Sequence, residues 1–177
     1  MNLADAECTA HELIQKHCPP EWCIKWDRAR TQFGCTIFKN QTISLSRPLT
    51  ILNDEAMFVW VVKHEIAHAL AGPNAVDHGP VWRSYARDLG IKPSRCWTSN
   101  GLDAVQIPGK VIGTCKNQCG YQHRQHKITW AAYHHYVCPA CSDRRRKRWV
   151  YLDWTSAGQP ITSPKRPQPR RRKYARS

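Results

Sequence analysis

Three histidines and one glutamate stand out in the apolar stretch VVKHEIAHALAGPNAVDHGPVW, which covers residues 61–82. His64 and His68 are four residues apart, so on a helix both imidazoles lie on one face and can reach the same ion. Glu65 points in a neighbouring direction, where it can take a proton from water instead of binding the metal. The spacing predicts a zinc site with two histidine ligands and a glutamate base.

A catalytic zinc site usually has three protein ligands and an open position. Gly72 and Pro73 end the helical pattern, and the following loop NAVD can return the chain across the histidine face. His78 is then the natural third ligand, and Asp77 competes for that role. The alternative is a chance string on an ordinary helix, but apolar residues nearly surround the motif, and burying these polar groups without a metal is costly.

The elements that must position these residues can be read from hydrophobic spacing. Residues 3–16 have the helical period. The runs WCIKWDRA, TQFGCTIF and QTISLS, within residues 22–46, predict a small antiparallel sheet. A second helix is predicted over residues 53–72 with Asn53 as its N-cap, and a third over residues 80–90. The pattern indicates an α+β fold.

A second set of metal ligands is predicted in TCKNQCGYQHRQHKITWAAYHHYVCPACS. Cys115 and Cys119 form one pair, and Cys138 and Cys141 form a second pair after an interval of 18 residues. This spacing indicates a structural zinc ribbon with four cysteine ligands, stabilising a module with little core of its own. Because the first gap is three residues instead of two, nearby histidines remain alternatives for the fourth ligand: His123, His126, His134 and His135.

Charge divides the chain into a neutral and a basic part. Residues 1–109 hold 11 basic and 11 acidic residues, whereas the remaining residues hold 16 basic and two acidic ones and carry the whole net charge of +14. We therefore expect a metal-binding domain over 1–109, a ribbon over 110–154, and a Pro-, Ser- and Arg-rich tail over 155–177 that is disordered in isolation.

The basic part also holds aromatic residues, about half of which should form the small core of the ribbon. Basic side chains neutralise phosphates and aromatic rings stack on unpaired bases, so the expected partner is DNA, in single-stranded or junction form. Two clusters supply the predicted contacts, namely Arg144, Arg145, Arg146, Lys147 and Arg148, and in the tail Arg170, Arg171 and Arg172.

The succession DRARTQFGCT, ISLSRPL, VVKHEIAHAL and HGPVWRSYARDLGI resembles the SprT-like metallopeptidase family, which includes the Spartan proteases. The resemblance covers residues 1–97, and HGPVW after HEIAH is its most specific part. It implies a zincin-like protease domain in which Zn²⁺ is bound by His64, His68 and His78 and Glu65 is the catalytic base. The family commonly has a four-cysteine zinc ribbon after this domain.

Together these features predict a zinc endopeptidase held on DNA that cleaves DNA-bound or DNA-crosslinked proteins, with one catalytic and one structural zinc ion. A substrate in extended form is expected to pair with an edge of the sheet, such as the ISLS strand. Two alternatives are a zinc protease with another substrate, and a nucleic-acid-binding zinc protein whose protease fold is structural.

Composition excludes several classes of protein. With 41% hydrophobic residues the chain should fold, and nine cysteines without an export signal do not indicate a disulfide framework. The longest apolar run, AMFVWVV, is too short to span a bilayer. We expect an intracellular protein without a membrane partner, cytoplasmic and nucleoid-associated, or nuclear in a eukaryote.

Overall fold

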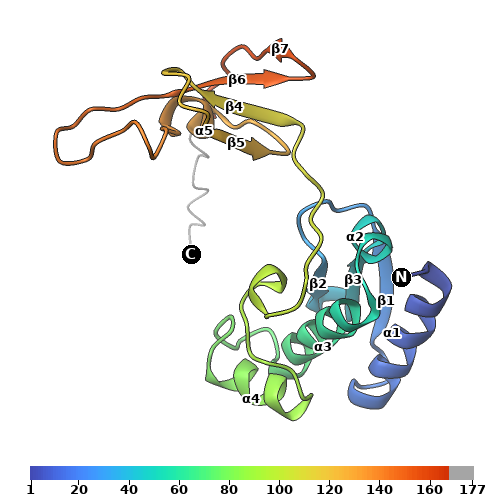
Figure 1. Cartoon of the computed structure of the whole chain (residues 1–177). Helices are drawn as coiled ribbons and strands as arrows, with labels where there is room; N and C mark the ends of the chain where they lie inside the picture. The colour runs from blue at the N-terminus through green and yellow to red at the C-terminus, as the bar shows by residue number, and fades with distance from the viewer. Residues whose placement is uncertain (168–177) are drawn as a thin grey trace, which may run out of the picture. The chain divides into compact units, whose positions relative to one another are not determined.

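The chain divides into two compact units, Met1–Ile107 and Pro108–Ser177, in a computed structural model that describes residues 1–167 (Figure 1). Each unit has its own sheet and its own group of buried residues. Among residues 1–167, no helix is long and apolar enough to cross a membrane.

The first unit contains the α-helices α1 (Leu3–His17), α2 (Arg47–Leu52), α3 (Glu55–Ala71) and α4 (Pro80–Asp88). Helix α3 begins after Asp54, whose carboxylate accepts a hydrogen bond from the Met57 N–H at 2.8 Å. It ends at Gly72, whose φ of 83° favours glycine. Asn53, the predicted N-cap, instead exchanges two hydrogen bonds with the backbone of Val105, at 2.8 and 2.9 Å.

The sheet of this unit is mixed, so the predicted antiparallel arrangement is only partly right. Its strands β1 (Cys23–Asp27), β2 (Gly34–Ile37) and β3 (Thr42–Ser46) lie in the order β1-β3-β2. Strand β2 is antiparallel to β3, but β1 is parallel to it. The parallel pair forms because the chain crosses from β1 to the far edge before it returns through the centre. The α+β class is confirmed.

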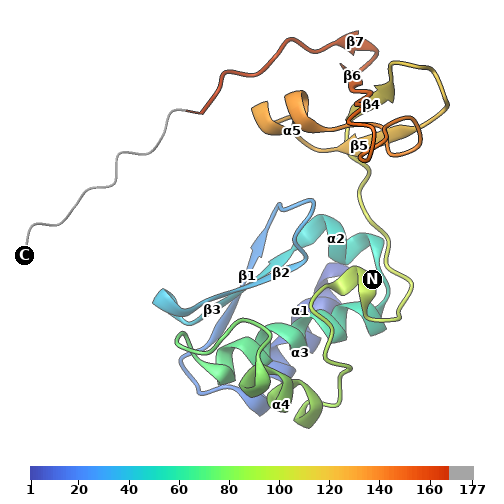
Figure 2. The same ribbon diagram turned by 90° about the vertical axis from the view of Figure 1, so that its left-hand side faces the viewer.

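Helix α3 connects the layers of the first unit. It contacts β2 and β3 on one side, and α1 and α4 also pack against it (Figure 2). Its residues Met57, Phe58, Val62 and Ile66 are fully buried. Burial of this helix on several sides explains why its sequence is apolar almost all round.

Within residues 108–167, the second unit has an antiparallel sheet in the order β5-β4-β6-β7 and one helix. Its elements are β4 (Val111–Cys115), β5 (Gln122–Gln125), α5 (Trp130–His135), β6 (Leu152–Ser156) and β7 (Gln159–Pro160). The sheet thus continues to Pro160, beyond residue 154 where the sequence placed the start of the tail. Composition missed the end of this sheet because residues 155–160, TSAGQP, contain no large apolar side chain and include Gly158, with a φ of 78°.

Candidate active site

Helix α3 carries two of the three predicted histidine ligands and the predicted base. His64 and Glu65 are buried, each with 7% of its surface exposed, and His68 is half-buried. The spacing of four residues brings the His64 and His68 rings to a centroid distance of 5.0 Å. Both rings therefore face the same point in space. The apolar packing of α3 holds the helix, and with it both rings, in place.

His78 reaches the same point from the loop between α3 and α4. Its Nε2 lies 3.1 Å from Nε2 of His64 and 3.2 Å from Nε2 of His68. Its φ of 49° is uncommon for a residue other than glycine, and Arg83 Nε donates a hydrogen bond to its carbonyl at 3.0 Å. This turn of the backbone presents the ring to the face of α3.

The three Nε2 atoms fit a zinc ion. Tetrahedral coordination with Zn–N bonds of about 2.0–2.1 Å separates two nitrogens by about 3.3 Å, close to the distances above. Within residues 1–167, each of these Nε2 atoms has only others of the three within hydrogen-bond distance, and a metal ion between them would give all three nitrogen lone pairs one partner. Burial and the neighbouring imidazoles lower the pKa of His64 to about 3 and that of His68 to about 4. Both rings are therefore neutral at pH 7, as metal ligands must be.

Two further side chains support the ligands. Trp82 of α4 is 1% exposed, and its ring centroid lies 4.8, 5.4 and 4.6 Å from those of His64, His68 and His78. Oδ1 of the exposed Asp77 lies 3.0 Å from Nδ1 of His78, although the two atoms are not aligned as a hydrogen bond. Asp77, the competitor for the third ligand position, lies outside the histidine cluster and beside His78.

The Glu65 carboxylate lies on the sheet side of α3. Thr36 Oγ1, on β2, lies 2.8 Å from Glu65 Oε2 and 2.9 Å from the Glu65 carbonyl oxygen, and its single hydrogen is shared between these two acceptors. Burial raises the pKa of Glu65 to about 7, while the hydroxyl and backbone N–H of Thr36 act in the opposite direction. A carboxyl group with this pKa can accept and release a proton near neutral pH.

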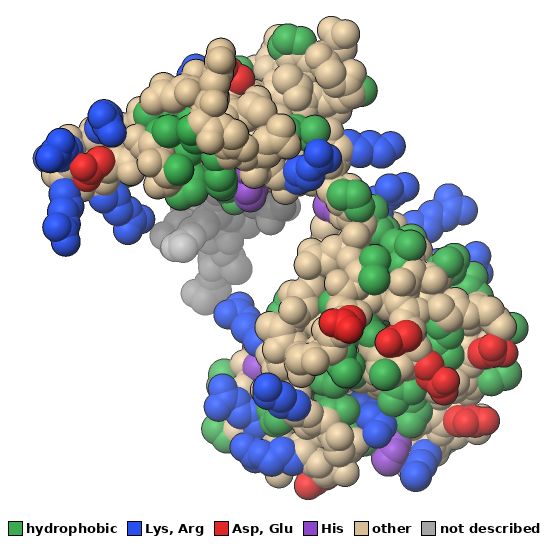
Figure 3. Space-filling model, in the orientation of Figure 1, with side chains coloured by type: hydrophobic (Ala, Val, Ile, Leu, Met, Phe, Trp, Pro, Cys, Tyr) green, Lys and Arg blue, Asp and Glu red, His purple; other side chains and the backbone are tan. Residues whose placement is uncertain are grey.

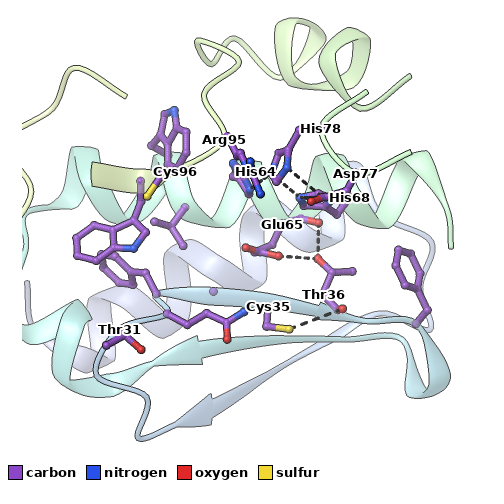
Figure 4. A pocket seen from close by; sticks show the side chains of 17 residues that line it. Thr31, Cys35, Thr36, His64, Glu65, His68, Asp77, His78, Arg95 and Cys96 are labelled. Atoms are coloured by element: carbon purple, nitrogen blue, oxygen red, sulfur yellow. Dashed lines mark hydrogen bonds and ion pairs between the residues drawn. The ribbon is translucent and has the colours of Figure 1, made fainter. Parts of the chain in front are cut away.

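A cavity of about 480 Å³ opens beside these groups (Figure 4). It is lined by the three histidines, Glu65, Asp77, residues 31–36 around β2, and the segment Arg95, Cys96 and Trp97. The sequence pattern indicated no helix, strand or site residue between the third helix and the first cysteine pair, and so missed the last of these segments. Their contribution depends on how the chain after α4 folds back, which no local pattern reveals.

The four predicted cysteine ligands of the second unit also come together. Their Sγ atoms all lie within 4.8 Å of one another, with Cys119 and Cys138 at 3.5 Å. A tetrahedral zinc site with Zn–S bonds of about 2.3 Å requires S···S distances of about 3.8 Å. A hydrogen bond from the Tyr121 N–H, together with the neighbouring thiols, lowers the pKa of Cys119 to about 7. The nearby histidines are not part of this group, namely His123, His126, His134 and His135.

The basic run Arg144–Arg148 lies on a tight turn before β6. Asp143 and Arg148 pair through their backbones at 2.8 and 3.0 Å, and Asp143 Oδ1 accepts hydrogen bonds from the N–H groups of Arg145 and Arg146. All five basic side chains are exposed, and Figure 3 shows Lys and Arg side chains gathered at the end of this loop. The tail contacts predicted at Arg170, Arg171 and Arg172 lie outside the described residues.

Exposed aromatic residues lie next to this run. Trp149 and Tyr151 are 44% and 41% exposed, and together with Arg144, His135 and Val137 they line a shallow pocket. Trp154, by contrast, is buried in the core of the unit. Tyr133 is partly buried against this core, so fewer aromatic residues than the predicted half belong to it.

Comparison with known proteins connects the first unit to a family. Residues 6–100 match the SprT-like family. The protein named SprT from Photorhabdus laumondii subsp. laumondii is 27% identical over 135 residues, which cover 71% of this chain and 66% of the relative, slightly less than two thirds. No solved structure matches the chain significantly. Since the matched residues include both α3 and His78 and make up more than half of the chain, this protein belongs to the SprT-like family.

Proposed function

We propose that this chain is a zinc-dependent endopeptidase that is held on DNA and cleaves DNA-bound or DNA-crosslinked proteins. The observation that carries the proposal is the convergence of three histidine Nε2 atoms beside a buried carboxylate in one cavity. Membership of the SprT-like family supports the metallopeptidase part. The exposed basic and aromatic residues of the second unit support the DNA part.

In the proposed mechanism, His64, His68 and His78 hold the zinc ion through Nε2. Bound zinc supplies polarisation of the scissile carbonyl and a lowered pKa for water. Glu65 accepts a proton from the attacking water, whose oxygen bonds to the carbonyl carbon. Glu65 then passes the proton to the nitrogen as the C–N bond breaks, which regenerates the carboxylate.

An extended substrate is proposed to pair with β2 instead of the ISLS strand. The ISLS residues belong to β3, which is bonded on both sides, so that expectation was wrong. Strand β2 is at the edge and lines the cavity. Ser46 N–H donates to Phe33 O at 2.8 Å, and antiparallel alternation then directs the N–H and C=O of Gly34 and the C=O of Thr36 away from β3, while the Thr36 N–H acts on the Glu65 carboxylate. These groups can pair with a substrate backbone.

Attachment to DNA is assigned to the second unit. The backbone pairing at Asp143 holds Arg144–Arg148 in a compact turn, which concentrates five positive charges on a short surface. Phosphate neutralisation by such a run gives affinity without sequence preference. The adjacent Trp149 and Tyr151 offer ring faces for unpaired bases, which favours single-stranded over duplex DNA.

The test is cleavage of a histone by the purified protein in the presence and absence of a long single-stranded oligonucleotide. Cleavage should require the oligonucleotide, stop with a chelator, and weaken steeply with salt. Glu65→Ala should keep its zinc content and lose about 10²–10⁴-fold in rate, the usual contribution of a general base. Glu55→Ala, at an exposed position of the same helix, is the matched control and should cleave normally.

Other results would favour the alternative functions. Tight binding to DNA without cleavage of any protein would indicate a nucleic-acid-binding protein with a non-catalytic protease fold. Equal cleavage with and without DNA, unchanged at high salt, would indicate a protease whose substrates have no relation to DNA.

A further inference from the structure

Two residues of β2 define the surroundings of the Glu65 carboxylate. Thr36 and Gly34 are two positions apart on the strand, so both face α3. The Thr36 hydroxyl lies between two oxygens of Glu65, at 2.8 Å from Oε2 and 2.9 Å from the backbone carbonyl (Figure 4). Among residues 1–167, Thr36 is the one residue that donates hydrogen bonds to this carboxylate.

Gly34 provides space on the other side of the same carboxylate. A Cβ atom at this position would lie 2.7 Å from Cγ of Glu65, 3.0 Å from its Oε1 and 3.0 Å from Cγ1 of Val61. Unlike Gly72, Gly34 does not have a positive φ. The position therefore requires the absence of a side chain and not an unusual backbone conformation.

The two carboxylate oxygens of Glu65 are thus in different environments. Oε2 is held by a hydroxyl, whereas Oε1 lies over the bare backbone of Gly34. A glutamate side chain has several rotatable bonds, and without a fixed partner its carboxylate would adopt several orientations. A hydrogen bond at one oxygen removes this freedom and leaves the other oxygen available.

We propose that Thr36 is a positioning residue for the catalytic base: its hydroxyl holds Oε2, so that Oε1, in the space above Gly34, is the oxygen that accepts the proton. In this step the proton moves from water to Oε1 and afterwards to the leaving nitrogen, while Thr36 keeps its own hydrogen. The inference rests on the proposed endopeptidase function. It adds which oxygen of Glu65 reacts and what orients it.

The experiment compares Thr36→Val and Thr36→Ser in steady-state cleavage of the same histone with single-stranded DNA. Valine keeps the branched shape and β-strand preference but lacks the hydroxyl, whereas serine keeps the hydroxyl. For Thr36→Val, kcat should fall about 10- to 100-fold, equivalent to a hydrogen bond to a charged group, while KM and zinc content stay near wild type. Thr36→Ser should recover most of kcat.

Thr42→Val is the matched control. Thr42 is a buried threonine on β3 whose hydroxyl bonds to the Asn40 carbonyl at 3.0 Å and does not contact Glu65. Its kcat should match that of the wild type. Gly34→Ala is a second variant that displaces the carboxylate without touching Thr36, and it too should lower kcat more than it raises KM.

The outcomes separate this inference from the proposed function. Wild-type protein that cleaves nothing would overturn both. Active wild type with an unchanged kcat in Thr36→Val would overturn the positioning role alone. Equal losses in Thr36→Val, Thr36→Ser and Thr42→Val, or a loss of bound zinc in Thr36→Val, would also overturn it, since either result indicates a general defect of the sheet.

Discussion

The histidine cluster lies on a helix within a core of seventeen buried hydrophobic residues, whereas the cysteine cluster belongs to a core of only five, counted over residues 1–167. Two of those five core residues, Cys115 and Cys138, are themselves predicted ligands. Apolar packing therefore positions the histidines before any metal binds. In the second unit, by contrast, the metal would hold together a core that is too small to fold alone.

The largest effect expected from this difference is loss of the second unit when its ligand set is broken. Cys138→Ala should unfold that unit, because structural zinc contributes an apparent binding free energy of about 10–16 kcal/mol. His68→Ala should lose the other zinc ion but leave the first unit folded. Metal analysis and two-dimensional NMR spectra of both variants test this. If His68→Ala also unfolded the first unit, the proposed difference between a site positioned by its core and a unit held together by its metal would be wrong.

The first site was predictable from sequence because its chemistry is local. The i, i+4 spacing of His64 and His68 and the Gly72 stop follow from helix geometry, and the loop is long enough for His78 to return. The four cysteines were predictable for a similar reason, since ligand pairs are close in sequence. Such features can be predicted from the spacing of residues along the chain, without knowledge of the tertiary fold.

Features that depend on distant residues were not predictable. The hydrogen bond between Thr36 and Glu65 joins positions 29 residues apart. The parallel pairing of β1 with β3 also depends on a crossover that no local pattern specifies. In both cases the determining interaction is packing of one element against another, which a single sequence does not record.

The next largest effect on stability should come from substitution of Trp82, which belongs to the core of the first unit and packs on all three histidine rings. Trp82→Ala removes a fully buried ring that packs on His64, His68 and His78, and should cost about 3–5 kcal/mol in the free energy of unfolding and weaken zinc binding. Urea unfolding and zinc competition measure the two effects. Val81→Ala, at an exposed position of the same helix, should stay within about 0.5 kcal/mol of wild type.

A smaller and opposite effect is expected at Glu65 in metal-free protein. Because its pKa rises from 4.5 to about 7 on folding, the folded state binds more protons than the unfolded state between these values. Its contribution to stability therefore falls as pH rises through this window. Glu65→Gln removes this penalty and should stabilise the metal-free protein by up to about 3 kcal/mol at pH 8, with no difference at pH 4.

Urea unfolding of the first unit in the presence of a chelator measures this difference at several pH values. Protonation of His64 and His68 below pH 6.5 affects both proteins alike, so it cancels in the comparison. A stability difference that does not change between pH 4 and pH 8 would contradict the assigned pKa of Glu65.

The smallest effect is expected at Asp77, which supports the one histidine ligand that α3 does not carry. Its carboxylate is exposed and 3.0 Å from Nδ1 of His78, so Asp77→Ala should weaken zinc binding about tenfold, the lower end for a group behind a metal ligand. Competition with a chromophoric chelator measures this, with Asp88→Ala as control, and the effect should shrink with added salt. An unchanged affinity would mean that the backbone turn at His78, held by Arg83, is sufficient to position the His78 ring. The third ligand would then be positioned by the folded chain before metal binds, as the two ligands on α3 are.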